Sequence, residues 1–170
     1  MTGPLELHEQ VAMLAARIVD RRERLLARWR EAVMQDPRVA AADSLSRAQF
    51  VDHIPAVLQS IHDAMIRHSG RAQAQPAELA QGHGSHRWQQ GYALLEVIRE
   101  CSHLQVAVLA EIEEAAEEQP GFDLRALNAA HQAVARLQKR NLRCCSKRHQ
   151  GRTMLRRNLG LHRPLFDTRR

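Results

Sequence analysis

The sequence predicts an all-α fold of about five to six helices, because apolar residues recur at helical spacing and no stretch alternates as a strand does. The helix formers Ala, Leu, Gln, Glu and Arg dominate the 170 residues, and 44% of the chain is hydrophobic. A chain of this length can bury one core. We therefore expect a single helical domain over residues 1–140, followed by an irregular basic tail over 141–170.

The first helical region is expected over residues 5–34, as one or two helices. Arginines and acids are interleaved there, which is typical of a solvated face with i,i+4 ion pairs. Asp36-Pro37 should end the region, since the residue before a proline avoids the α conformation, and a loop is expected over 37–45. One apolar stripe runs along the region and gives Trp29 a structural role: Val11, Leu14, Ala15, Ile18, Val19, Leu25, Leu26, Trp29 and Val33.

The next helix begins with a capping signal. Ser46 is followed three residues later by Gln49, the spacing of a capping box. Pro55 lacks a backbone donor, so it predicts a kink or a break near His53. We assign structural roles to both His53 and Pro55.

The chain is organised around the stretch from His83 to Ile112, whose second part predicts one long helix. Its apolar face holds Leu94, Val97, Ile98, Cys101, Leu104, Val108, Leu109 and Ile112. The first part is polar and aromatic, and Gly91 breaks its pattern. Its candidates for sensing a ligand or signal are His83, His86, Arg87, Trp88, Gln90 and Tyr92. The alternative is structural: these groups shape a loop and bridge helices by hydrogen bonds.

After an acidic run over Glu111–Glu118, Pro120-Gly121 predicts a stop, and Asp123 is placed to cap a last helix. The tail differs from the domain in charge. Residues 141–170 hold nine Lys and Arg against one acid, whereas residues 1–140 hold sixteen against eighteen. Such a tail could bind nucleic acid through phosphate contacts. A shifted reading frame in a GC-rich gene would give the same composition in the tail, and the chain would then be the front part of a larger sensor.

The sequence predicts a cytoplasmic protein without a membrane segment. No apolar run approaches the roughly 20 residues that a membrane helix needs, and the N-terminus has no signal-peptide pattern. The three cysteines form no disulfide framework, since Cys144 and Cys145 are adjacent and Cys101 lies on an apolar helix face.

Histidines raise the alternative of a haem or metal sensor. His83 and His86 form an H-x-x-H pair, and His103 could lie near them, as a zinc or haem site would require. This spacing is common by chance, and no cysteine or acid is set beside the pair. We therefore expect no metal and no cofactor.

The motifs of common enzymes are absent from the sequence. It contains no P-loop, no dinucleotide fingerprint, no G-x-S-x-G and no paired cysteine motif. The segment around His53 lacks the acidic and basic neighbours of a kinase phospho-acceptor box, and no ATP-binding region follows. We expect the protein not to be an enzyme.

Several short pieces, in order and spacing, are similar to one family. They are Ile18-Val19 to Leu25-Leu26, Arg28-Trp29-Arg30, Leu45-Ser46-Arg47, Phe50 to Pro55, His83-Gly84, His86-Arg87-Trp88, Gln90-Gly91-Tyr92 and Leu94 to Glu100. Over residues 9–140 the chain resembles the N-terminal domain of RsbR-type proteins, the RsbT co-antagonists of bacterial stress signalling. The same domain stands at the front of many sensor histidine kinases.

The resemblance implies a globin-like helical fold, usually without haem, that works as a dimeric sensory input module. The exposed faces of the first and last helices would form the homodimer, and a signal would change how the last helices emerge. The partner would be a kinase or a STAS output module, and neither is present in this chain. The chain also departs from the family at Cys101-Ser102, where relatives tend to have an aromatic and a basic residue.

Overall fold

The computed structural model describes residues 6–52, 54–68, 87 and 89–139, and this part of the chain contains helices, turns and loops but no strand. The all-α prediction is confirmed. The tail over 141–170 and His53 lie outside the described residues. The helices are α1 (Leu7–Asp20), α2 (Arg22–Met34), the 3₁₀ helix η1 (Ala40–Ser44), α3 (Arg47–Val51), α4 (Ile54–His68), α6 (Leu94–Glu117) and a helix over residues 124–139, which we call the 124–139 helix.

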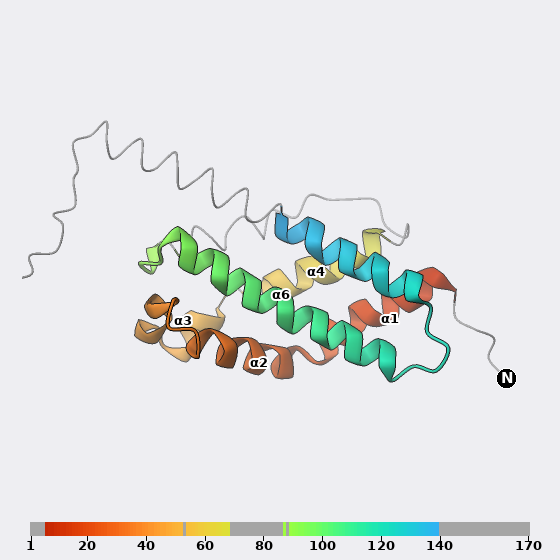
Figure 1. Ribbon diagram of the computed structural model, residues 1–170, viewed down its shortest axis with the longest axis horizontal. Coiled ribbons are helices and arrows are strands. Elements are labelled where there is room, and N and C mark those ends of the chain that lie inside the picture. Colours follow the sequence, from red (N-terminus) through yellow and green to blue (C-terminus); the bar gives the residue numbers. More distant parts are fainter. Residues whose placement is uncertain (1–5, 53, 69–86, 88, 140–170) are drawn as a thin grey trace, which may run out of the picture.

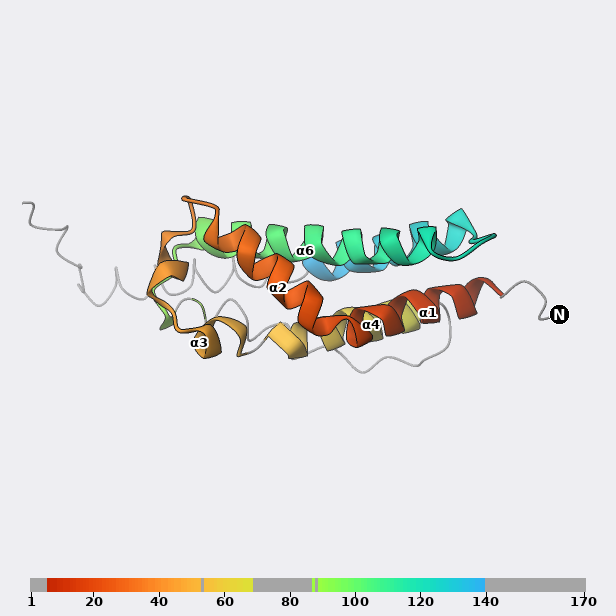
Figure 2. The same cartoon turned by 90° about the horizontal axis from the view of Figure 1, so that it is seen from below.

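The helices form two layers (Figures 1 and 2). One layer pairs α6 with the 124–139 helix, which runs antiparallel beside it; the Gln138 side chain donates to the backbone oxygen of Cys101 across this pair. The other layer contains α1 packed against α4, and α2 continues from α1 towards α6. The core lies between the layers, where α1 and α2 both contact α6.

The helix signals around Pro55 are placed as the sequence predicts. Ser46 and Gln49 form a capping box at the start of α3. Helix α3 ends at Val51 and α4 begins at Ile54, so the helix is interrupted just before Pro55. Pro55 lies in the first turn of α4, where its missing N–H removes no intrahelical hydrogen bond.

The loop predicted over 37–45 is wrong in part, because Ala40–Ser44 forms a 3₁₀ helix. Backbone bonds with three-residue spacing tighten this connection: Val39 donates to Asp36, and Ala42 donates to Val39. Val39 and Ala42 are both 1% exposed, so the tight winding brings two small apolar side chains into the core. The sequence did not reveal this 3₁₀ helix, because a short run of alanines between Pro37 and Ser44 has no distinctive helical pattern.

The long helix α6 is pinned at both ends. At its start the Glu96 carboxylate accepts from the Ala93 N–H at 2.7 Å and from the Ala41 N–H at 2.9 Å. Beyond its end, Gly121 has a φ of 74°, a conformation that glycine adopts without strain. Asp123 then accepts from the Arg125 N–H at 2.8 Å, which is the predicted cap of the 124–139 helix.

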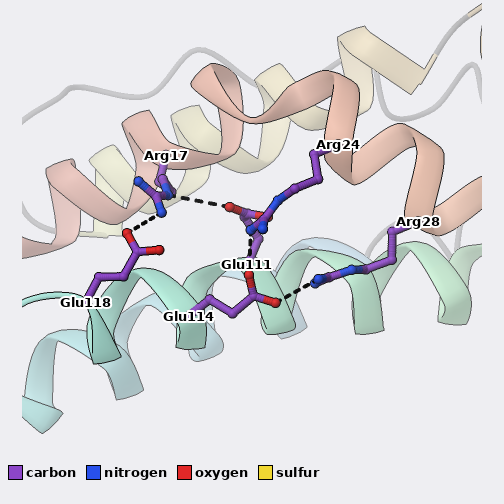
Figure 3. Close-up of polar contacts among 6 residues, drawn as sticks. All are labelled: Arg17, Arg24, Arg28, Glu111, Glu114 and Glu118. Atoms are coloured by element: carbon purple, nitrogen blue, oxygen red, sulfur yellow. Dashed lines mark hydrogen bonds and ion pairs between the residues drawn. The ribbon is translucent and has the colours of Figure 1, made fainter.

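Three arginines of the first two helices reach across to three glutamates of the acidic run at the end of α6 (Figure 3). Arg17 pairs with Glu118, Arg24 with Glu111 at 2.6 Å and with Glu114 at 2.5 Å, and Arg28 with Glu114 at 2.7 Å. The predicted i,i+4 pairs within a solvated face are wrong for these arginines. Their carboxylate partners come from a helix some 90 residues away in sequence.

Glu111 is the buried member of this set. Its side chain is 1% exposed, and it lies between Arg24 and Arg17, whose Nε is 3.5 Å from its carboxylate. A carboxylate taken out of water needs such partners, because burial disfavours an unpaired charge strongly. The acidic run therefore fixes how α6 lies over α1 and α2.

Candidate functional site

The described part of the predicted sensing cluster centres on an ion pair that is sealed from water. The side chains of Arg87 and Glu100 are both 0% exposed. Arg87 Nε lies 2.8 Å from each carboxylate oxygen, and Nη2 lies 2.5 Å from Oε1. Charge-assisted contacts of this kind are among the strong hydrogen bonds in proteins.

The same guanidinium closes the end of α3. Its Nη2 donates to the Phe50 carbonyl at 2.6 Å, and Nη1 donates to the Gln49 carbonyl at 3.3 Å. The last carbonyls of any helix lack intrahelical donors, and the break before Pro55 leaves those of α3 inside the protein. A cation there supplies the missing donors and complements the negative end of the helix dipole.

Backbone hydrogen bonds from the turn at Gln90 and Gly91 position the arginine. The backbone N–H groups of Gln90 and Tyr92 both donate to the Arg87 carbonyl at 3.1 Å. Gly91 has a φ of 92°, so the turn favours glycine at this position. The Gln90 side chain accepts from Arg87 Nη1 at 2.7 Å and donates to the Gln49 carbonyl at 3.3 Å.

Aromatic rings enclose the ion pair. The guanidinium carbon of Arg87 is 5.1 Å from the ring centre of Phe50 and 5.2 Å from that of Tyr92, within the range of cation–π attraction. Trp29 stacks on Phe50 with ring centres 4.5 Å apart. The Trp29 indole N–H donates to the Glu100 backbone oxygen at 3.2 Å, so α2 is also tied to the pair.

Burial governs protonation in this centre. It raises the pKa of the Glu100 carboxyl, and the hydrogen bonds and charge of Arg87 oppose that shift. Burial also raises the pKa of the Tyr92 phenol, and the charge of Glu100 adds to the effect. The phenol oxygen is buried and has no hydrogen-bond partner within the described residues. Tyr92 therefore remains protonated across the physiological pH range.

The predicted cluster is placed only in part. Arg87, Gln90 and Tyr92 come together, with Gly91 in the turn between them and Trp29 against the same centre. His83, His86 and Trp88 lie outside the described residues. Arg87 and Tyr92 are sealed in the core, whereas Gln90 is half-buried at its edge. The described members thus form a joint between helices, and Gln90 is the member that meets the surface.

Sequence reasoning missed Glu100 as a member of this centre. Its signal was its position: Glu100 falls in register with Leu104, Val108 and Glu111 on the face that α6 buries. A charged residue on a buried stripe requires a partner of opposite charge. Arg87, thirteen residues earlier, supplies it.

The described histidines form no metal site. His103 Nε2 lies 3.0 Å from Asp36, and Arg99 approaches the same carboxylate at 4.0 Å. Within the described ranges, no group of three or more His, Cys, Asp or Glu side chains could hold a metal ion. The other two metal candidates, His83 and His86, lie outside those ranges.

A small pocket of about 30 Å³ opens between α4, α6 and the 124–139 helix. It is lined by Val57, Ile61, Cys101, Leu104, Gln105, Val134, Leu137 and Gln138. Pockets for small molecules usually span about 300–1,000 Å³. This space is far smaller than a haem, and its described lining contains no histidine.

Comparison with protein-family models, with curated proteins and with solved structures finds no match to this chain. Within the described part, no helix combines the length and the apolar character needed to cross a membrane.

Removing either partner of the central ion pair should destabilise the fold strongly. Arg87→Met leaves Glu100 buried and unpaired, and Glu100→Leu does the same to Arg87. Each single change is expected to cost about 3–5 kcal/mol in the free energy of unfolding. The double variant should cost less than the sum of the two, by about 1–3 kcal/mol. Urea unfolding of the four proteins measures this coupling, and strictly additive losses would contradict a paired role.

The hydrogen bonds that Asp36 accepts from Arg38 and His103 should account for part of the loss of fold stability at low pH. Hydrogen bonds from Arg38, and then from His103, hold the pKa of Asp36 well below its usual value of 3.8. A lowered folded-state pKa stabilises the fold above the unfolded value, and that contribution is lost as the pH falls towards the folded-state pKa. Asp36→Asn should therefore lower Tm at about pH 6, and by progressively less as the pH falls below about 4. The exposed Asp43→Asn is the control, and a pH-independent loss in Asp36→Asn would refute the argument.

Proposed function

We propose that this chain is a non-catalytic sensory input domain of bacterial stress or two-component signalling, acting as a haem-free homodimer. The observation that carries the proposal is the Arg87 centre. One buried guanidinium joins the end of α3, the turn at Gln90 and Gly91, and α6, while Trp29 brings in α2. Movement of any of these four segments would therefore disturb the contacts that hold the others.

Such a joint suits a switch because it has few intermediate states. A sensory domain needs two packings of similar energy, and a signal must favour one of them. Displacing the Arg87 guanidinium would leave the buried Glu100 carboxylate and the buried Phe50 carbonyl without this donor, so its contacts are expected to break together. Gln90 offers a route inward, since it is half-buried and bonds directly to Arg87 and to α3.

The output partner belongs to the same proposal. The resemblance to RsbR-type N-terminal domains suggests a STAS module or a histidine kinase, attached to or separate from this domain. The signal would reach it through the 124–139 helix, which leads out of the domain. This helix contacts α6 directly, so a change at the Arg87 centre has a packed path towards the output.

The homodimer is best supported on the outer face of α6 and the 124–139 helix. Among the described residues, the large apolar side chains that are more than 65% exposed all come from that layer: Leu95 at 68%, Val106 at 66% and Leu124 at 77%. On the first helix, Leu7 and Val19 are only 40% and 37% exposed. Exposed apolar surface of this kind marks interaction sites. We therefore favour α6 with the last helix over the first helix.

A chimera tests the sensory role. Residues 1–140 would replace the input domain of an RsbR-type co-antagonist, and a stress-dependent reporter would be measured with and without stress. We expect a stress-dependent response that Gln90→Ala weakens, because this change cuts the contact at the edge of the joint. Gln132→Ala, an exposed change on the 124–139 helix, is the control. Output that ignores stress, from a chimera that is folded, would refute the proposal.

A charge at the proposed dimer face should produce monomers. Val106→Glu places two carboxylates against each other across the face, whereas Val19→Glu places a charge on α1. Sedimentation equilibrium should show a dimer for the native chain and for Val19→Glu, and a monomer for Val106→Glu. Dissociation by Val19→Glu alone would instead place the interface on the first helix.

A further inference from the structure

An open groove of about 840 Å³ runs between α2 and the α3–α4 segment. Its apolar part is formed by Leu26, Ala27, Ala48, Val51 and Pro55. Charged residues also line it: Arg22, Glu23, Arg30, Glu31 and Arg47. The groove is on a different side of α2 from the arginines that bind the end of α6, and it is separate from the Arg87 centre.

Among the described residues, two of the three arginines in the groove form no ion pair with a carboxylate. Arg22 lies 3.5 Å from Glu23, and Glu31 accepts from Gln35. Arg30 and Arg47 are exposed, and neither has a carboxylate partner within the described residues. By contrast, Arg24 and Arg28 on the other side of α2 are paired with glutamates.

The side of α2 that faces α6 shows how this helix packs against another helix. There α6 packs its apolar stripe against α2 and sets Glu111 and Glu114 along the edge, within reach of arginines (Figure 3). The groove repeats the same two elements, an apolar strip and arginines at its margin. It differs in that two of its arginines, Arg30 and Arg47, have no carboxylate partner among the described residues.

We propose that this groove binds an amphipathic helix of a partner protein, with an apolar stripe and glutamates along one edge. The apolar stripe would lie on Ala27, Ala48 and Val51, and the glutamates would pair with Arg30 and Arg47. This is the helix-in-groove mode of recognition, in which apolar contacts give affinity and charges fix the orientation. The proposal does not depend on the sensory role.

The probe for this surface is a fluorescent peptide that copies residues 104–118 of this chain. It carries the apolar stripe of α6 together with Glu111, Glu114 and Glu118. Fluorescence anisotropy at low salt should show saturable binding to the full-length protein. A peptide with every glutamate changed to glutamine should bind about tenfold more weakly, and raising the salt should weaken the native peptide's binding.

Matched variants place the contact. Arg30→Gln/Arg47→Gln should weaken peptide binding by about tenfold, whereas Arg136→Gln/Lys139→Gln, which removes the same charge from the 124–139 helix, should not. Ala48→Glu should abolish binding, because its larger, negatively charged side chain fills the groove and repels the peptide. Unchanged far-UV circular dichroism and Tm would show that these exposed substitutions leave the fold intact.

Three outcomes would overturn the proposal. One is no binding of the peptide to the native protein, and another is equal binding of the glutamate and glutamine peptides. The third is self-association of the native protein that Arg30→Gln/Arg47→Gln abolishes, since the groove would then hold a second copy of this chain.

Discussion

A single buried guanidinium is the constraint on which the end of the fold formed by α3 and the start of α6 depends. Arg87 satisfies the Glu100 carboxylate and two carbonyls at the end of α3 at once. Inside a protein, hydrogen bonds to a charge are strong, but each buried group left without a partner costs free energy of similar size. The break before Pro55, the turn at Gly91 and the placement of α6 are therefore parts of one arrangement, because each positions a partner of the same cation.

The same kind of pairing recurs further along α6. Glu100 and Glu111 are eleven residues apart, which is close to three helical turns and about 16 Å along the axis. Both carboxylates point into the buried face, and both are met by arginines from other segments. A slide of α6 along its axis would take both carboxylates away from their arginines and leave buried charges without partners. The Glu100 pair sets the position of α6 against α3, and the Glu111 contacts set it over α1 and α2.

Local signals in the sequence were sufficient for several helix boundaries, although not for the 3₁₀ helix over Ala40–Ser44. Ser46 with Gln49, the proline at 55 and Asp123 mark boundaries through their own backbone chemistry, so a single sequence reveals them. Pairings between distant segments were not visible in the same way. The sequence around Arg24 and Arg28 offers acids nearby, and only the packing of α6 brings Glu111 and Glu114 closer. The Arg87 cluster was singled out for its residue types, yet its partner Glu100 was read as part of an apolar helix.

The nature of the centre also bears on how a signal could act. An exposed ion pair exchanges partners with water in small steps, and its energy changes gradually. The Arg87 pair is sealed under Phe50, Tyr92 and Trp29, so water cannot replace one contact at a time. Any rearrangement must carry the guanidinium to a new set of acceptors or leave the carboxylate to take up a proton, a change that burial already favours. The sensory role proposed above would therefore require two discrete arrangements of this centre, and Gln90, which contacts both Arg87 and α3 at its edge, would be the point where a surface event reaches it.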